Sequence, residues 1–251
     1  MAKKKDNSPA SDLSVEQKSM IGPHLNFAAS EAYKLLRTNL LFSFPAEEKC
    51  HVIGITSSFQ GEGKSMTSIN LSYTLAEANN RVLLIEGDMR IPNFSNRLNL
   101  KKTPGLSNLL AGLDSISDAI QRIAFRRSSN PEPVKFDVIT AGNIPPNPSE
   151  LMQSARMQHL LNTLKGFYDI IIVDLPPINV VTDALVISHY VSGIAVVVRN
   201  EHASKHGLAN TMRQLRLVNA KVIGFIYTNA ENYKKKYYKG YSKYYKKEYR
   251  A

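Results

Sequence analysis

The sequence predicts an α/β protein in which helices cover both faces of a mostly parallel central sheet, and three observations predict this fold class. Five apolar runs lack the alternation of apolar and polar residues that marks half-exposed strands, so they are typical of buried parallel strands. Helical patterns fall between these runs, which implies right-handed strand–helix–strand crossovers. A length of 251 residues suits one large domain of this kind with flexible ends.

The expected elements alternate along the chain. We expect strands at residues 52–56, 82–85, 169–173, 194–198 and 222–227, with a weaker candidate at 137–140. We expect helices at residues 29–42, 65–78, 149–164, 183–191 and 204–218. Because an open parallel sheet binds its ligands beyond the carboxyl ends of its strands, the chemistry should lie just after Thr56, Ile85, Val173 and Tyr227.

The two ends of the chain differ in composition from its middle. Residues 1–27 are largely polar and led by lysines, and we expect them to form a flexible N-terminal segment. The folded domain should span residues 28–229, and residues 230–251 should form a disordered tail rich in tyrosine and lysine. That tail holds no Leu, Ile, Val, Met or Phe with which to build a packed face.

Positive charge dominates the chain and is concentrated in this tail. The chain has 32 Lys and Arg against 21 Asp and Glu, a formal net charge of +11, which favours phosphates, anionic lipid or acidic protein segments as partners. Eight basic and two acidic residues give the tail a charge of +6. Besides a plain solvated tail, its composition allows contact with nucleic acid, contact with anionic lipid, or use of its tyrosines as phosphate acceptors. These tyrosines are Tyr233, Tyr237, Tyr238, Tyr241, Tyr244, Tyr245 and Tyr249.

The shortage of cysteine and the lack of a long apolar segment exclude further classes of protein. The single cysteine, Cys50, excludes a disulfide framework, a Cys-ligated zinc site and an iron–sulfur scaffold. No run of about 18 apolar residues is present, and the N-terminal residues lack the apolar core of a signal peptide. We therefore expect a cytoplasmic protein.

The first apolar run leads into a glycine-containing turn that opens directly into a helix. Residues 57–65 read Ser-Ser-Phe-Gln-Gly-Glu-Gly-Lys-Ser, a variant P-loop with Ser58 where the strict pattern has glycine. Backbone N–H groups and the helix dipole favour phosphate at such a turn, Lys64 would neutralise phosphate charge, and the Ser65 hydroxyl would ligate Mg²⁺. The alternative is an ordinary turn that the glycines merely permit. The expected fold is therefore that of a P-loop NTPase, with ATP contacts from Gly61, Glu62, Gly63, Lys64, Ser65 and Met66.

Carboxylates follow two further apolar runs. Asp174 closes the run at residues 169–173, where an aspartate is costly unless it is paired or bound to metal, so we interpret it as the Walker B residue that holds Mg²⁺. Asp88, with Glu86 two residues earlier, follows the run at residues 82–85, and one of the two could accept the proton of an attacking hydroxyl or orient a water bound to the metal. Taken alone, Asp88 would be a capping or turn residue. The candidate catalytic residues are Lys64, Glu86, Asp88 and Asp174, and the candidate metal ligands are Ser65, Asp88 and Asp174.

Several motifs in this order resemble one family. Besides the P-loop, they are Glu-Gly-Asp-Met-Arg at residues 86–90, Gly-Asn-Ile-Pro-Pro-Asn-Pro-Ser-Glu-Leu at 142–151, Asp-Leu-Pro-Pro at 174–177 and Thr-Asp-Ala at 182–184. Together with the tyrosine-rich end, these residues resemble the bacterial tyrosine kinases of capsular and exopolysaccharide clusters. The resemblance extends from about residue 27 to the end of the sequence.

The resemblance implies a Mg-ATP-dependent kinase that phosphorylates tyrosines, first those of its own tail, and that regulates polysaccharide synthesis and export. It also implies a cytoplasmic subunit at the inner face of the membrane, bound to a membrane-embedded adaptor and opposed by a phosphotyrosine phosphatase, with no nucleic-acid partner. Asn229 matches a position that can contact adenine. Glu31, Lys34 and Arg37 resemble the family's Glu-x-x-Arg-x-x-Arg motif, which packs subunits into a ring.

Two positions depart from the family pattern. Glu86 stands where the family usually has aspartate, and its extra methylene would weaken activity if this position supplies the base. Lys34 replaces an arginine and so loses a bidentate fork that would stabilise the ring. Two other functions stay open: a partitioning-type P-loop ATPase without kinase activity, and a non-catalytic, nucleotide-dependent interaction module. The partitioning ATPases typically carry an additional lysine early in the P-loop, where this chain has Ser57, Ser58 and Phe59.

Overall fold

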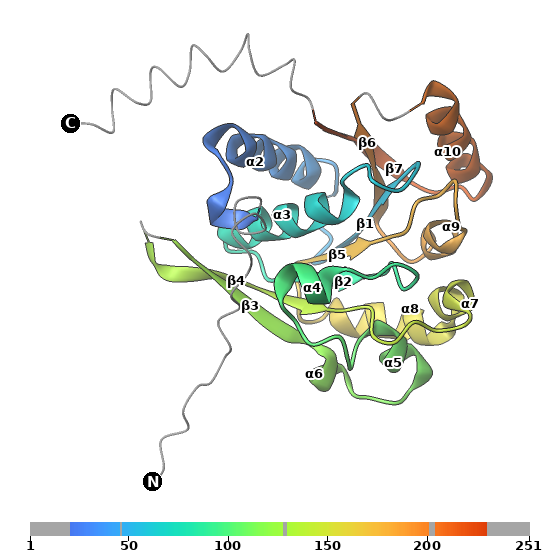
Figure 1. The fold of residues 1–251 in the computed structure, drawn as a ribbon, viewed down its shortest axis with the longest axis horizontal. Helices are drawn as coiled ribbons and strands as arrows, with labels where there is room; N and C mark the ends of the chain where they lie inside the picture. Colours follow the sequence, from blue (N-terminus) through green and yellow to red (C-terminus); the bar gives the residue numbers. More distant parts are fainter. Residues whose placement is uncertain (1–20, 46, 128–129, 201–203, 230–251) are drawn as a thin grey trace.

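Seven strands form one sheet in the computed structural model, which describes residues 21–45, 47–127, 130–200 and 204–229 (Figure 1). All neighbouring strands are parallel except the pair β3–β4. The ends of three strands that carry the sequence motifs lie side by side, because β5 pairs with both β1 and β2. In spatial order the strands are β3 (Gln121–Arg127), β4 (Asn130–Ile139), β2 (Val82–Glu86), β5 (Ile170–Asp174), β1 (His51–Ser57), β6 (Gly193–Arg199) and β7 (Val222–Thr228).

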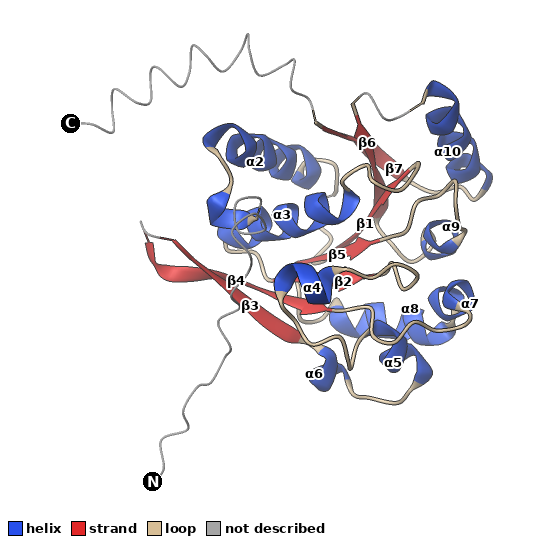
Figure 2. Ribbon diagram, in the orientation of Figure 1, coloured by secondary structure: helices blue, strands red, loops and turns tan. Residues whose placement is uncertain are grey.

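Helices cover both faces of this sheet (Figure 2). Because successive strand side chains point to opposite faces, Val52 of β1 contributes to one core and Ile53 to the other. The face that includes Ile53 is covered by α2 (Phe27–Leu41), α3 (Lys64–Glu77) and α4 (Phe94–Leu98). The face that includes Val52 is covered by α5 (Leu106–Ala111), α6 (Ile116–Ala119), α7 (Pro148–Gln153), α8 (Ala155–Leu164), α9 (Asp183–Ile187) and α10 (Lys205–Leu217). The three-layer α/β fold with a mostly parallel sheet is thereby confirmed.

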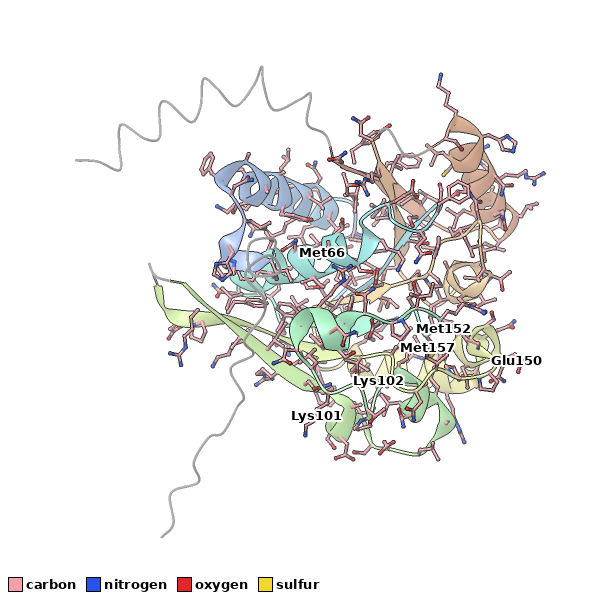
Figure 3. The ribbon with its side chains drawn as sticks, viewed as in Figure 1. Met66, Lys101, Lys102, Glu150, Met152 and Met157 are labelled. Carbon is pink, nitrogen blue, oxygen red and sulfur yellow. The ribbon has the colours of Figure 1, made fainter. Side chains whose placement is uncertain are left out.

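The helix that we expected at residues 149–164 is two helices. Ser154, between α7 and α8, has an extended backbone, and its side chain accepts a hydrogen bond from the Met157 N–H at 3.3 Å, so it caps α8. Met152 and Met157, on either side of the break, are fully buried and lie across the sheet from Met66 of α3 (Figure 3). The helix expected at 183–191 is also shorter and ends at Ile187.

One strand at the sheet edge was not expected. Strand β3 pairs antiparallel with β4, which begins at Asn130 rather than at residue 137. Arg122 of β3 donates two hydrogen bonds, of 2.7 and 2.9 Å, to the buried carboxylate of Asp137 on β4. The five apolar runs are all strands, each within one or two residues of the expected bounds, whereas the short helices α4, α5 and α6 were not expected.

Residues 21–27 were expected to belong to a flexible end, but in the structure they contain a short helix and the start of α2, with Ile21 and Gly22 buried. Ile21 is 2% exposed, and the Gly22 N–H donates to Asn70 Oδ1 of α3 at 2.9 Å within the short helix η1 (Gly22–His24). Helix α2 begins at Phe27, where the Asn26 side chain accepts a hydrogen bond from the Ala29 N–H. Across the described ranges, no helix has the length and apolar content needed to span a bilayer. Residues 1–20 and 230–251, including the tail tyrosines, lie outside the described residues.

Candidate active site

The P-loop lies between β1 and the N-terminus of α3, where the sequence predicts it. Gly61 and Gly63 have φ angles of +84° and +93°, left-handed values that favour glycine, and Gly63 immediately precedes α3. Glu62, between them, is buried, and its Oε2 accepts a hydrogen bond from the Phe59 N–H at 2.9 Å. The turn therefore has a fixed shape and presents the unpaired N–H groups of the first helical turn, which is where phosphate binds to proteins.

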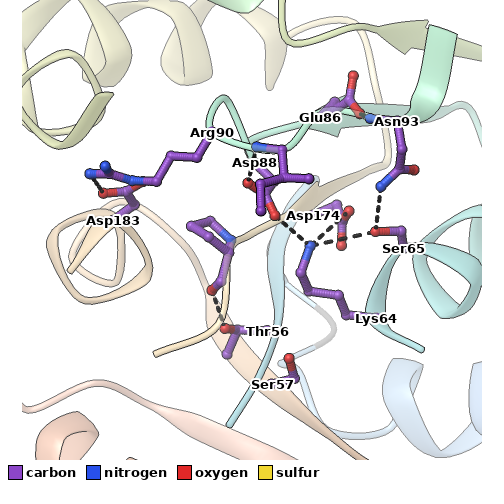
Figure 4. Close-up of polar contacts among 12 residues, drawn as sticks. Thr56, Ser57, Lys64, Ser65, Glu86, Asp88, Arg90, Asn93, Asp174 and Asp183 are labelled. Carbon is purple, nitrogen blue, oxygen red and sulfur yellow. Dashed lines mark hydrogen bonds and ion pairs between the residues drawn. The ribbon is translucent and has the colours of Figure 1, made fainter. Parts of the chain in front are cut away.

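Lys64 joins the acidic residues that follow β2 and β5 (Figure 4). Its Nζ lies 2.9 Å from Asp88 Oδ2 and 3.5 Å from Asp174 Oδ2. All three side chains are nearly inaccessible to solvent, with 10%, 8% and 1% of their surface exposed in that order. Ser68, one turn into α3, donates to Asp174 Oδ1 at 3.1 Å. The structure thus brings three of the four predicted catalytic residues together at the carboxyl ends of adjacent strands.

Charge at this cluster is governed by burial and by the ion pairs. Burial by itself lowers the pKa of Lys64, but the carboxylates of Asp174 and Asp88 raise it by more, so its net pKa lies above the ordinary value and the ammonium stays charged. Burial raises the pKa of Asp174, and the nearby Lys64 opposes this rise. Among the described residues this buried carboxylate has one cationic partner, Lys64 at 3.5 Å, so it is well suited to gain a further one.

Glu86 does not join this cluster, which corrects the expectation that its carboxylate is available to the reacting groups. Its Oε1 accepts hydrogen bonds from the N–H groups of Asn93 and Phe94, and its Oε2 accepts one from Ala141. These donors lie at the start of α4 and just after β4, and Glu86 is 1% exposed. Burial raises the pKa of Glu86, and the three N–H donors oppose the rise. We therefore infer a structural function for this carboxylate, which fixes the loop after β2 to the end of β4.

A second ionic contact, not foreseen from the sequence, connects three of the sequence motifs. Arg90 Nε and Nη2 donate to the two carboxylate oxygens of Asp183 at 2.9 and 3.0 Å. Arg90 Nη2 also donates to Ser149 Oγ at 3.0 Å, and the Ser149 hydroxyl donates to Asp183. Asp183 begins α9 and its side chain is fully buried. The motifs at residues 86–90, 142–151 and 182–184 therefore meet at one carboxylate.

Helix α10 supports the P-loop from outside the site. Thr211 Oγ1 donates to Ser58 Oγ at 2.9 Å, and both residues are buried. Ser58 occupies the position where the strict P-loop pattern has glycine. A serine at this position provides the hydroxyl that accepts the hydrogen bond from α10. Closer to the N-terminus of α10, Gly207 leaves room for Phe59, because a Cβ there would lie 2.4 Å from the Phe59 ring.

A cavity of about 300 Å³ opens at this end of the sheet. The P-loop forms one wall, with Lys64 and Met66 among its lining residues. The loops that follow β2 and β5 form the opposite wall, which includes Asp88, Ile91 and Val180. A triphosphate at the N-terminus of α3 would therefore extend along one wall, with its terminal phosphate directed to the acidic residues.

Comparison with known proteins identifies the family. A family model described as an AAA domain matches residues 50–226. Tyrosine-protein kinase YwqD of Bacillus subtilis is 34% identical over 197 residues, which cover 78% of this chain and 79% of YwqD. Tyrosine-protein kinase CpsD of Streptococcus pneumoniae is 32% identical over 202 residues, 79% of this chain and 83% of CpsD. The chain belongs to the bacterial tyrosine kinases. The resemblance that the motifs indicated is therefore confirmed.

Solved structures place the kinase in the same family. The chimerical protein CapA2B2 superposes with a TM-score of 0.72 at 30% identity, covering 86% of this chain and 90% of that one. The kinase domain of Escherichia coli ETK also gives 0.72, at 33% identity, covering 80% and 75%. The septum site-determining protein MinD of Pyrococcus horikoshii, complexed with Mg-ADP, gives 0.54 at 22% identity over 71% and 70% of the chains. That last similarity shows a common fold.

The acidic residues of the kinase fit a magnesium ion. Asp174 Oδ2 is buried and accepts no hydrogen bond. Ser65 Oγ lies 3.5 Å from both Lys64 Nζ and Asn93 Nδ2, at the limit of hydrogen bonding, so it too has capacity for a ligand. Carboxylate and hydroxyl oxygens are the ligands that Mg²⁺ prefers, and Mg²⁺ usually shares its coordination with water and substrate phosphates. Consistent with such sharing, the described ranges contain no group of three or more His, Cys, Asp or Glu residues that could hold a metal alone.

The end of β7 reaches the other side of the P-loop. Thr228 Oγ1 donates to the Glu62 carbonyl oxygen at 2.8 Å, and Arg199 Nη1 at the end of β6 donates to the Gly61 carbonyl oxygen at 3.0 Å. Asn229, the predicted adenine contact, is exposed directly after Thr228 and has a φ of +55°. Asn229 therefore directly follows a residue that is bonded to the P-loop, and its side chain is accessible.

The residues predicted to pack subunits of the kinase lie on α2. Lys34 Nζ pairs with Glu31 Oε1 at 2.7 Å, and both side chains are about two-fifths exposed at 41% and 39%. Arg37 faces α3 instead, where its Nη1 donates to the Thr74 carbonyl oxygen at 2.9 Å. Glu31 and Lys34 therefore form the accessible part of the motif, and Arg37 anchors the helix that carries them.

Proposed function

We propose that this kinase transfers the γ-phosphoryl group of ATP to tyrosine hydroxyls, first those of its own C-terminal tail. The observation that carries the proposal is the Lys64 ammonium between the buried carboxylates of Asp88 and Asp174, at the N-terminus of the helix that follows a P-loop. Kinases built on P-loops catalyse phosphoryl transfer by positioning and by charge stabilisation, and this cluster provides the groups for both.

The residues of this cluster divide phosphate binding, metal binding and proton transfer among them in the proposed reaction. Gly61, Gly63 and the first turn of α3 bind the phosphates, and Lys64 neutralises charge on the β- and γ-phosphates. Ser65 and Asp174 would hold Mg²⁺, with Asp88 contributing through a bound water, and the ion would neutralise charge on the phosphate oxygens. The phenolic oxygen forms a bond to the γ-phosphorus while the bond from that phosphorus to the β–γ bridging oxygen breaks, which leaves ADP. Asp88 accepts the phenolic proton, because Glu86 is occupied by three backbone N–H groups.

The proposed acceptors are the seven tail tyrosines, Tyr233 to Tyr249, which lie outside the described residues. A tail with a charge of +6 is attracted to a site rich in carboxylate and phosphate. Each phosphotyrosine adds about −1.5 to −2, so roughly three or four cancel the charge of the tail. The tail of a neighbouring subunit would therefore enter the site, be modified and then be repelled, which loosens the assembly.

The wider setting of the kinase is also part of the proposal. The name of the solved chimera, CapA2B2, indicates that it combines CapA2 and CapB2 sequences. This combination supports a membrane-embedded adaptor as the partner of this chain. Bound to it, the kinase would lie at the inner face of the membrane and assemble as a ring through Glu31 and Lys34 on the helix that Arg37 anchors. A phosphatase would reverse the phosphorylation, and the kinase would regulate capsular or exopolysaccharide synthesis and export. Residues 21–229 would be the catalytic domain, since Ile21 and Gly22 pack against it, with residues 1–20 and the tail 230–251 outside it.

The decisive experiment incubates the purified full chain with Mg-ATP, with and without the cytoplasmic tail of the adaptor, and maps phosphopeptides from residues 230–251. Phosphotyrosine that is lost in Lys64→Met supports the proposal, and Lys205→Met on the exposed N-terminus of α10 is the matched control. ATP hydrolysis without phosphotyrosine would instead indicate a partitioning-type ATPase. Neither activity would indicate a nucleotide-dependent interaction module.

A further inference from the structure

Two exposed β-branched side chains stand at the mouth of the catalytic cavity. Ile91 is 57% exposed and Val180 is 62% exposed, and both line the cavity that holds Lys64 and Asp88. A single exposed apolar side chain needs no explanation. Two that converge on a charged cavity, one from the loop after β2 and one from the loop after β5, form an apolar entrance to a polar site.

Hydrogen bonds of the backbone N–H groups hold the chain at both of these residues. The Ile91 N–H donates to Asp88 Oδ1 at 3.1 Å, so the position of Ile91 is fixed relative to the proposed proton acceptor. The Val180 N–H donates to the Pro177 carbonyl oxygen at 3.2 Å in the turn after β5, and Pro177 also lines the cavity. The backbone of the entrance is therefore held in place before a substrate binds, which lowers the entropy cost of receiving a side chain.

The geometry of phosphoryl transfer decides which substrate meets this entrance. The attacking and leaving oxygens lie roughly in line on opposite sides of the γ-phosphorus. Because the P-loop wall would hold the leaving ADP, the acceptor must approach from the opposite wall, which carries Asp88, Ile91 and Val180. A phenolic hydroxyl lies at the far end of an apolar ring, so its ring would contact the entrance when its oxygen reaches Asp88.

We propose that Ile91 and Val180 clamp the ring of the acceptor tyrosine and thereby select tyrosine over serine. The occupant is the tail, residues 230–251, of a second copy of this chain, and this inference rests on the proposed function. Charge supports this occupant, since the tail carries +6 and the Mg-bound nucleotide of the proposed reaction would add net negative charge beside Asp88, which lines the cavity. Of the cations that line the cavity, Lys64 is paired with Asp88 and Arg90 with Asp183, and Arg97 is the third.

The test measures ring recognition separately from chemistry. Three fluorescent peptides would carry the sequence of residues 232–247 with its tyrosines intact, all replaced by phenylalanine, or all replaced by serine. Their affinities for the full chain are measured by anisotropy in the presence of Mg-ADP. We expect the phenylalanine peptide to bind about tenfold more tightly than the serine peptide, because the ring adds buried apolar area. Ile91→Ser and Val180→Ser should each reduce the logarithm of this affinity ratio by about half. The double variant should bind the two peptides with equal affinity.

Leu113→Ser and Phe167→Ser are the matched controls, because these side chains are 73% and 64% exposed and do not line the cavity. With the tyrosine peptide as substrate, the clamp variants should raise KM by about fivefold to tenfold and change kcat little. A thermal melt shows whether each variant is folded, and Ile91→Ala with Val180→Ala repeats the test with a smaller change. Equal peptide discrimination in the wild-type and clamp variants would overturn the clamp. Absence of phosphotyrosine in the wild type would instead count against the proposed function, and the binding ratio would still decide the clamp.

Discussion

Arg90 grips the buried carboxylate of Asp183 with two parallel hydrogen bonds, across 93 positions of sequence. The pair joins the loop after β2, which carries Asp88, to the first turn of α9. Such a bidentate contact fixes direction as well as distance. Asp88 therefore lies on a loop that is restrained by its own bond to the Ile91 N–H and, two residues on, by Arg90.

Breaking this contact should cost stability and also displace Asp88. In Asp183→Asn the side chain can no longer accept both guanidinium hydrogen bonds, and we expect a loss of about 1–3 kcal/mol in the free energy of unfolding, since bonds to charged groups contribute in this range. Arg90 is 37% exposed and can be rehydrated, so we expect the lower half of the range. Urea unfolding and kcat for tail phosphorylation would be measured together. Asp169→Asn, which breaks the more exposed Arg81–Asp169 pair, serves as control and should leave kcat unchanged.

Glu86→Gln should lower stability and largely spare kcat, whereas Asp88→Asn should lower kcat and keep the fold. The glutamine amide would direct an NH₂ group at backbone N–H donors, so one or two of them lose their acceptor, and we expect a loss of about 1–3 kcal/mol in unfolding free energy for each. Its kcat, measured below the lowered melting temperature, should stay within a few-fold of the wild type. Asp88→Asn should keep the fold and lose about 10²- to 10³-fold in kcat. A folded Glu86→Gln protein that is inactive would show that Glu86, not Asp88, takes the proton.

Gly207→Ala should weaken nucleotide binding from outside the site. The new methyl group would lie 2.4 Å from the Phe59 ring, which must move, and this ring belongs to the P-loop residue whose N–H is bound by Glu62. We expect a loss of about 1–3 kcal/mol in unfolding free energy and a raised Kd for a fluorescent ADP analogue. Gly166→Ala is the matched control, because its nearest contact is the Thr163 carbonyl oxygen at 3.4 Å. Equal Kd values for both variants would show that α10 does not influence nucleotide binding at the P-loop.

Cys50 should be unreactive at neutral pH. Burial raises its pKa to about 11, with smaller effects of Lys165, Asp169 and Arg81. At pH 8 a thiol with this pKa is about a thousandth ionised, whereas an ordinary cysteine is roughly a quarter ionised. We therefore expect the folded protein to react with iodoacetamide about a hundredfold more slowly than the urea-unfolded protein at pH 8. The rate should rise as pH approaches 11, and comparable rates in both states at pH 8 would contradict this assignment.

The central strands could be predicted because they are buried on both faces and therefore apolar along their length. Strand β3 could not, because it lies at the edge, contains Arg122 and other polar residues, and is defined by its pairing with β4. The break between α7 and α8 depends on one residue, because Ser154 caps α8 and an N-cap residue does not have the helical conformation. Short helices such as α4 offer too few residues for a periodic pattern.

Some features of the candidate site could likewise be predicted from the sequence, and others could not. Lys64, Asp88 and Asp174 could be predicted because each follows a strand whose end is fixed by the sheet. The orientation of Glu86 could not, because β2 ends at this residue and the same-face relation of positions two apart does not extend beyond a strand. The contacts of Asp183 with Arg90, and of Thr211 with Ser58, join distant segments through side chains, and no local pattern in the sequence encodes such partners.

One lysine contacts two buried carboxyl groups in this site, so when both are ionised these three side chains together carry one more negative than positive charge. A bare nucleotide adds several more negative charges at the same place, and repulsion from Asp88 and Asp174 opposes its entry. A divalent cation that arrives with the nucleotide would restore the balance. In the proposed reaction the site would therefore admit metal-loaded ATP in preference to metal-free ATP, before any acceptor is present.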